Sequence, residues 1–285
     1  MKKILILVSL LLLPLFVTGE MQEFDIKDDI LSTAYSNNKL YLKVGYGESN
    51  VYQLSNDGAL KLDLIDCKLD EEEDRLLVVE DSIYKINEKE YKLKLVEKGK
   101  NGFGEEIRLI DKKQANALLK KKKIKGDAWL DPCLGSYYSN KELVSAMFDN
   151  DENCYIANYN IETKKSELVD LNDKTARVLH AENGKSLILN GKNEVLLIDW
   201  ADKSIKVHSK LPKEASCVAY ADENFYYLDK GCKKLIKQDK AGKTEEIFAD
   251  LPDLSCLYAH IIGDSYVVTA VTKENKNKII SIGLK

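Results

Sequence analysis

The chain has 285 residues, and its 43 lysines and arginines are outnumbered by 47 aspartates and glutamates, giving a formal net charge of −4. Domains that hold the phosphate backbone of nucleic acid usually carry a basic surface, so this balance argues against nucleic acid as a partner. The length is sufficient for a substantial buried core.

The first nineteen residues have the pattern of a secretory signal peptide. Lys2 and Lys3 precede an apolar run over 4–17, and small or modest residues follow up to Gly19. The run is shorter than the roughly 20 residues that a membrane-spanning helix needs, although an uncleaved anchor is the alternative. We predict cleavage before Glu20 and an exported protein that is secreted, at the cell surface, or in a spore or cell wall, and peripheral to a membrane at most.

Short strand-like runs begin after this segment and recur as units of four. In one unit, the runs are 176–180, 186–189, 194–198 and 204–208. The Asn190-Gly191 pair between the second and third runs is a strong hairpin signal. Units of this kind follow one another at a spacing near forty residues, over 30–64, 65–97, 129–171, 175–211, 216–248 and 254–284.

Four-stranded units at this spacing resemble the blades of the β-propeller superfamily, which bury their faces by stacking around an axis. We predict an all-β fold, a six-bladed β-propeller that forms one domain over 20–285; a seven-bladed ring and a pair of sandwiches are the alternatives. The last unit has three clear strands, so Met21–Ile26 is expected to supply its fourth strand and close the ring.

The resemblance carries no catalytic residues. The Trp-Asp pair of WD40 blades is missing, since Asp199-Trp200 has the reverse order, and the kelch double glycine and the sialidase Asp-box are also absent. We therefore expect a protein that is not an enzyme and that uses no cofactor.

The segment 98–127 does not fit the repeat and is predicted to be an insertion between blades two and three. Residues 111–125 read as a helix, because Ala115, Leu118 and Leu119 share one face and no glycine or proline interrupts them. Gly99, Gly102 and Gly104 precede the helix and are interpreted as a flexible entry to it. Long insertions in compact domains are often functional.

This insertion carries the clearest functional signal, a cluster of lysines. Residues 111–125 hold seven lysines and one aspartate. The basic-basic-x-basic order within 121–126 is typical of heparin-binding segments. The predicted glycan-binding residues are Lys112, Lys113, Lys120, Lys121, Lys122, Lys123 and Lys125. A merely solvated lysine face is the competing interpretation.

Other candidate chemistry is weaker. His180 and His260 fall in the first strands of their units, which line a propeller channel, where they could bind a metal or relay a proton. No metal-binding histidine pair supports this, so polar channel residues are the preferred interpretation and no metal is expected. Asp149–Asn153 has alternating oxygen ligands like a calcium loop but lacks the glycine and distal glutamate, so a solvated turn is favoured. The acidic run 70–74 is read in the same way.

Six cysteines are present in a chain with an export signal: Cys67, Cys133, Cys154, Cys217, Cys232 and Cys256. Three disulfides are permitted, in fifteen possible pairings, and buried thiols are the alternative. No Cys-x-x-Cys pair occurs, which argues against a zinc ribbon or a thioredoxin-like site.

The signal peptide, the lysine-rich composition and the heparin-type motif together resemble the small spore wall proteins of microsporidia, a likeness that implies adhesion to host glycans. The leading hypothesis is an exported surface or wall protein that binds an anionic polysaccharide or a surface protein partner through the lysine-rich insertion. An envelope assembly scaffold is the first alternative. The second is a hydrolase or lyase that works in the propeller channel.

Overall fold

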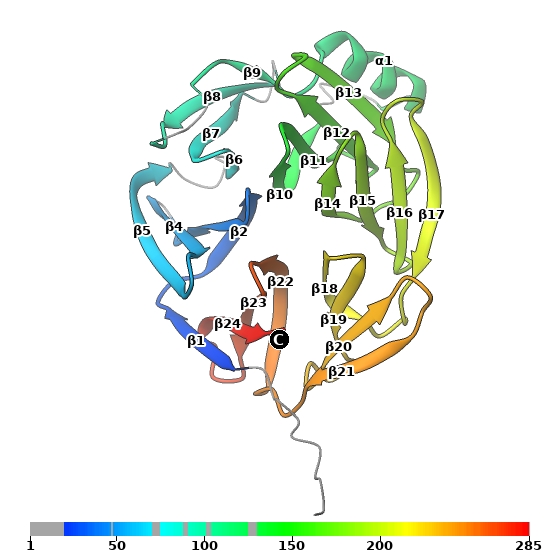
Figure 1. Ribbon diagram of the computed structural model, residues 1–285. Helices are drawn as coiled ribbons and strands as arrows, with labels where there is room; N and C mark the ends of the chain where they lie inside the picture. Colours follow the sequence, from blue (N-terminus) through cyan, green and yellow to red (C-terminus); the bar gives the residue numbers. More distant parts are fainter. Residues whose placement is uncertain are drawn as a thin grey trace, which may run out of the picture.

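The computed structural model describes residues 20–46, 48–69, 75–87, 91–100, 104–124 and 130–284. The predicted signal peptide and the acidic run 70–74 therefore lie outside the described residues. Within them the chain is almost entirely β-structure, and the sheets stand around a central axis with their first strands facing it (Figure 1). The all-β, propeller-like prediction is confirmed.

Three sheets among the described residues are four-stranded meanders, in which each strand pairs with the next along the chain. Their strands are β6 (Leu77–Val79), β7 (Ser82–Asn87), β8 (Lys92–Glu97) and β9 (Ile107–Arg108); β14 (Ala176–Glu182), β15 (Lys185–Asn190), β16 (Glu194–Asp199) and β17 (Ser204–Lys210); β18 (Ser216–Ala221), β19 (Asn224–Leu228), β20 (Leu235–Asp239) and β21 (Thr244–Phe248).

A fourth sheet joins the two ends of the described chain. It consists of β22 (Leu254–Ile262), β23 (Ser265–Thr272) and β24 (Asn277–Gly283), with β1 (Met21–Ile26) as its outer strand. The antiparallel register runs from Met21 opposite Ile282 to Ile26 opposite Asn277. The Lys278 ammonium forms ion pairs with Glu23 and Asp25 on β1. The predicted closure of the ring by the N-terminal strand is confirmed.

The remaining sheet has eight strands, because two four-stranded meanders share a short parallel contact. The meanders are β2 (Ile30–Ser36), β3 (Lys39–Val44), β4 (Ser49–Asn56) and β5 (Leu60–Leu69); and β10 (Asp131–Ser139), β11 (Glu142–Phe148), β12 (Cys154–Asn160) and β13 (Lys165–Asp170). Only two residue pairs join β2 to β10, Tyr35 with Tyr137 and Ser36 with Tyr138. This contact brings the inner strands of the two meanders together at the axis.

Burial differs between middle and outer strands in the way that stacked sheets require. The middle strands β11 and β23 are buried along almost their whole length, because neighbouring sheets cover both of their faces. The outer strands β17 and β21 are mostly exposed. The apolar side chains pack in several clusters, each holding residues from more than one sheet.

The turn between the second and third strands is built alike in three sheets. Asp149, Asn190 and Asp229 each accept hydrogen bonds through Oδ1 from two backbone N–H groups that follow them, at 2.8 to 3.1 Å. Short polar side chains favour turns because they replace the missing backbone partners in this way. Asp149 also accepts hydrogen bonds from Asn153 and from the Tyr155 hydroxyl, so its carboxylate is part of the turn.

Boundaries around the predicted insertion differ from those expected. α1 covers Lys112–Lys122, within the predicted 111–125, and follows β9 in the chain. β9, a strand of two residues that pairs with β8, falls inside the segment 98–127 that we interpreted as insertion. Two residues are too few to show a strand period, so the pattern could not reveal this strand. Across the described ranges, no helix is long and apolar enough to cross a bilayer.

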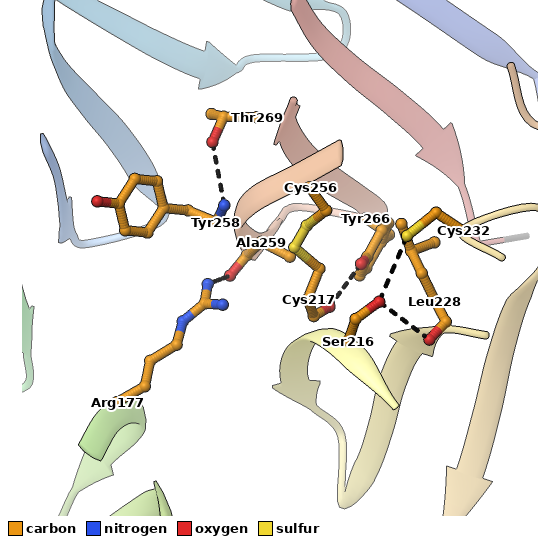
Figure 2. The surroundings of a disulfide bond; sticks show 10 residues. All are labelled: Arg177, Ser216, Cys217, Leu228, Cys232, Cys256, Tyr258, Ala259, Tyr266 and Thr269. Carbon is orange, nitrogen blue, oxygen red and sulfur yellow. Dashed lines mark hydrogen bonds between the residues drawn. A yellow bond between two sulfur atoms is a disulfide. The ribbon is translucent and has the colours of Figure 1, made fainter. Parts of the chain in front are cut away.

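One disulfide occurs among the described cysteine side chains. Cys217 of β18 is bonded to Cys256 of β22, and the Cys232 thiol lies 3.5 Å from the Ser216 hydroxyl beside them (Figure 2). Cys67 and Cys154 are buried thiols, which is the alternative that we weighed for several cysteines. The side chain of Cys133 lies outside the described part of the structure.

Candidate functional site

The lysine-rich helix α1 lies on the outer rim of the ring, beside β13 and away from the axis (Figure 1). Asp111 caps its start by accepting hydrogen bonds from the backbone N–H groups of Lys113 at 2.7 Å and Gln114 at 3.2 Å. Ala115 and Leu119 are buried against the core, as the apolar face predicted. The helix is therefore held by its start and by one face, with the opposite face directed outward.

Five of the seven predicted lysines are exposed on this helix or at its C-cap: Lys112, Lys113, Lys120, Lys121 and Lys123. Lys122 is different, because its ammonium is 2.8 Å from the Asp170 carboxylate and 2.9 Å from the Asn172 side-chain oxygen. It fastens the helix to β13. Lys125 lies outside the described residues.

A second candidate site lies at the axis and consists of aromatic and imidazole rings. The inner strands β2, β10, β14, β18 and β22 each contribute one ring: Tyr35, Tyr137, His180, Tyr220 and His260. The rings of Tyr35 and Tyr137 are stacked with centroids 4.5 Å apart, and His260 lies parallel to Tyr35 at 5.8 Å. His180 is 5.9 Å from Tyr137 and 5.3 Å from Tyr220. The five rings thus form a continuous arc.

This arc surrounds a cavity of about 210 Å³. The lining also includes residues at the turns that follow the inner strands, such as Asn38, Asp222 and Gly263, so the cavity occupies the end of the axis where these strands finish. A much smaller cavity of about 10 Å³ shares Tyr137, Val178 and His260 with it. The rest of that lining comes from residues earlier in the inner strands and from Ala146 of β11.

Hydrogen bonds connect the arc to a carboxylate. The Tyr137 hydroxyl is 3.1 Å from His180 Nδ1, and His180 Nε2 is 3.4 Å from Glu182 Oε2. A proton on Nε2, donated toward Glu182, leaves the Nδ1 lone pair to accept the hydrogen bond from the tyrosine. His260 has no such partner, because its Nε2 is buried without a hydrogen bond among the described residues.

Burial keeps the three tyrosines and His260 neutral. Desolvation raises the pKa of Tyr137 well above its ordinary value of 10, and it raises the pKa values of Tyr35 and Tyr220 in the same direction. Burial also lowers the pKa of His260 to about 3, with a further contribution from the Arg177 charge. The three tyrosines and His260 therefore offer neutral hydrogen-bonding groups and ring faces at neutral pH.

The sequence identified His180 and His260 as channel residues, and the structure places both at the axis. The tyrosines were missed, although each occupies the first strand of its unit, which is the one signal that could have indicated them. No group of three potential metal ligands occurs within the described ranges. The calcium-like segment 149–153 is a hydrogen-bonded turn, as favoured from its sequence.

No protein-family model matches the chain, and no curated protein matches it in sequence. Solved structures do resemble it. A streptogramin B lyase has a TM-score of 0.51 at 13% identity, with 94% of this chain and 99% of that chain covered. Prolyl oligopeptidase B from Galerina marginata has a TM-score of 0.52 at 13% identity, covering 90% of this chain and 40% of that one. The WD40 β-propeller domain of Doa1 has a TM-score of 0.46 at 8% identity, with 92% and 96% covered.

The class of the protein follows from the sheet arrangement and from these similarities: the chain is a β-propeller. At such low identities the likeness shows the fold alone, and propellers of this kind serve very different functions. The function must therefore be argued from the chain's own residues.

Proposed function

We propose that this protein is an exported, non-enzymatic propeller that binds an anionic polysaccharide, of the heparin type, through the exposed lysines of α1. In this proposal the ring has six blades, the eight-stranded sheet counts as two of them, and α1 is an insertion between blades two and three. The protein acts at the cell surface or in a spore or cell wall.

The observation that supports the proposal is the way in which α1 presents its charge. The buried side chains of Ala115 and Leu119 hold the helix on the rim, and the Lys122 ammonium is paired with the Asp170 carboxylate. The other described lysines of the cluster remain exposed on a helix with no acidic residue in its first turn. Clustered ammonium groups on a fixed frame can contact several anionic groups of one polymer at once.

Such binding has a distinctive physical signature. A polyanion carries a shell of condensed counterions, and each ammonium that contacts the chain releases part of that shell. The affinity therefore falls steeply as salt is added, as it does for proteins that bind a phosphate backbone. A single exposed lysine contributes little, whereas five on one helix act together.

The test is heparin-affinity chromatography of residues 20–285 over a salt gradient. One variant replaces Lys123, the left-handed C-cap, by asparagine and the other four exposed lysines by alanine, which has the highest helix propensity. It leaves the Lys122–Asp170 ion pair in place. The control variant replaces five exposed lysines on other parts of the ring and has the same net charge: Lys185, Lys192, Lys206, Lys213 and Lys230.

We expect the wild type and the control to be retained above physiological salt, and the α1 variant to elute near the start of the gradient. Equal elution of the two variants would show that retention reflects overall charge and would refute the site. If all three proteins flow through, the envelope scaffold becomes the leading hypothesis, and native pull-down should then find a stoichiometric partner. Export itself is tested by N-terminal sequencing of extracellular protein, which should begin at Glu20.

A further inference from the structure

Arg177 occupies an unusual place for a charged residue, inside the ring. It is the second residue of β14, and its side chain extends to β22, where Nη2 donates a hydrogen bond to the Ala259 carbonyl oxygen (Figure 2). β18 lies between these two strands in the ring (Figure 1). The guanidinium thus reaches past one inner strand to the next, through the space beside the axis.

Among the described residues, no carboxylate forms an ion pair with this guanidinium. The described residues give Arg177 no salt bridge, and its other contact is the face of the Tyr258 ring, 5.9 Å from the guanidinium carbon. A guanidinium has five N–H donors, so one hydrogen bond leaves most of them available. Burying a cation without an anion is costly, and the lowered pKa of Arg177 reflects that desolvation.

The charge is connected to the axial cavity. Arg177 lines the small cavity, which shares the walls formed by Tyr137, Val178 and His260 with the larger one. The larger cavity is lined by Val178, Leu179 and His180, the three residues that follow Arg177 on β14, so Arg177 lies directly beyond its inner end. A molecule entering between the aromatic rings would therefore approach the guanidinium with its leading end.

A second unsatisfied group lies on the same path. His260 Nε2 is buried without a hydrogen-bond partner among the described residues, and His260 lines both cavities. Buried polar atoms almost always have partners, so His260 Nε2 and the neighbouring guanidinium offer hydrogen-bonding capacity to a molecule that enters the cavity. The acid in the lining, Asp222, belongs to the turn after β18 at the opposite end of the cavity.

We propose that the axial cavity binds a small aromatic carboxylate, with its carboxylate between Arg177 and His260 and its ring against Tyr35 and Tyr137. The carboxylate accepts charge-assisted hydrogen bonds from the guanidinium, which are stronger than neutral ones. The aromatic part packs against the parts of the two tyrosine rings that line the cavity, and contacts between aromatic rings are attractive beyond the area that they bury. A cavity of about 210 Å³ has room for one substituted benzene ring. This site is independent of the lysines on α1.

The test is isothermal titration calorimetry of residues 20–285 with benzoate and with benzamide, which has nearly the same shape but no charge. We expect saturable binding of one benzoate per chain and binding of benzamide that is about 10- to 100-fold weaker, since hydrogen bonds to a charged group are at stake. Arg177→Met should weaken benzoate to the level of benzamide and leave benzamide unchanged. The α1 lysine variant should bind benzoate like the wild type.

Equal affinity for benzoate and benzamide in the wild type would refute the proposal, and this comparison needs no variant that must fold. Undiminished benzoate binding by a folded Arg177→Met protein would also refute it. If acetate competes with benzoate at equal concentration, the site recognises the anion alone and the role assigned to the tyrosines is wrong. Tyr35→Leu should weaken benzoate binding without changing the preference for the anion.

Discussion

Cys217 of β18 and Cys256 of β22 form a disulfide whose Cα atoms are 6.2 Å apart, and the bond joins the inner strands of two adjacent sheets. The two cysteines are 39 residues apart in the chain, so the bond closes a loop of nearly one repeat. It acts as a covalent crosslink across an interface that packing and a hydrogen bond from the Tyr266 hydroxyl to the Cys217 carbonyl oxygen also hold. Bonds of this kind stabilise a protein chiefly by restricting its unfolded chain.

Replacement of both cysteines by alanine is expected to lower the free energy of unfolding by about 3 to 4 kcal/mol, on the loop-entropy relation for this separation. Urea denaturation with and without a reductant measures the loss. Reductant should reproduce it in the wild type and have no effect on the double variant. Cys232→Ser in every protein removes the nearby thiol as an exchange partner. An unchanged midpoint in the double variant would contradict the expectation.

Ring closure by β1 should contribute strongly to stability. Ile26 is buried beside residues of β2 and β23, and its replacement by alanine is expected to cost about 2 to 5 kcal/mol. Met21, which is largely exposed on the same strand, is the control, and Met21→Ala should cost far less. Thermal denaturation followed by circular dichroism compares them.

Deletion of residues 20–26 removes the whole strand, so the backbone groups of β24 that face β1 lose their partners while those that face β23 keep theirs. Unprotected sheet edges pair with other chains. We expect the shortened protein to self-associate on size-exclusion chromatography at concentrations where the complete chain elutes as one sharp species. A shortened protein with unchanged elution and stability would show that β1 is dispensable for closure.

The neutral state of His260 predicts a dependence of stability on pH. Its pKa in the folded protein is about 3, below the ordinary 6.5 that it regains on unfolding. Between these values the unfolded chain binds a proton that the folded protein excludes, so stability is complete above about pH 6.5 and decreases as the pH falls. This one group contributes a slope of at most about 1.4 kcal/mol per pH unit.

Urea denaturation at several pH values between about pH 7 and pH 4 checks this slope. His260→Phe keeps a ring beside Tyr35 and should make the dependence less steep. His208→Gln, at an exposed histidine on β17, is the control and should retain the wild-type slope. If both variants lose stability with falling pH as steeply as the wild type, acid destabilisation arises from groups other than His260.

The structure explains Gly99 by the close packing of its backbone against Asp81. The sequence had instead suggested a flexible entry to the helix. A Cβ atom at this position would overlap the Cβ and the carbonyl oxygen of Asp81. The Asp81 carboxylate also accepts hydrogen bonds from Lys39 at 2.7 Å and from Tyr41 at 3.1 Å. Gly99→Ala should therefore destabilise the protein by about 1 to 3 kcal/mol, as overpacking does.

The matched control for this change is Gly104→Ala. There the added methyl group would meet the mobile end of the Lys98 side chain at 3.3 Å, which can move away. Differential scanning calorimetry should show a clearly lower melting temperature for Gly99→Ala than for Gly104→Ala. Equal melting temperatures would mean that the backbone at Asp81 can shift to make room for the added methyl group at little cost in stability.

Much of the architecture was predictable because it depends on local patterns. The Asn190-Gly191 hairpin, the short alternating strands and the leftover strand Met21–Ile26 each leave a signal within a few residues. The same is true of α1, whose apolar face is set by the spacing of Ala115 and Leu119. β9 escaped prediction because a two-residue strand has no measurable period.

The sites are a different matter. The clustering of lysines on α1 is visible in the sequence. The sequence does not show that Lys122 is paired with Asp170, because Asp170 lies nearly fifty residues away in the chain. The arc from Tyr35 to His260 and the reach of Arg177 to Ala259 join strands from across the whole chain. Repetition of a four-stranded unit determines that inner strands meet at an axis. Tyr137, His180, Tyr220 and His260 even follow one another at 43, 40 and 40 residues, close to the spacing of the units. Only the tertiary structure decides which position of each inner strand faces the cavity, because that depends on how neighbouring sheets pack.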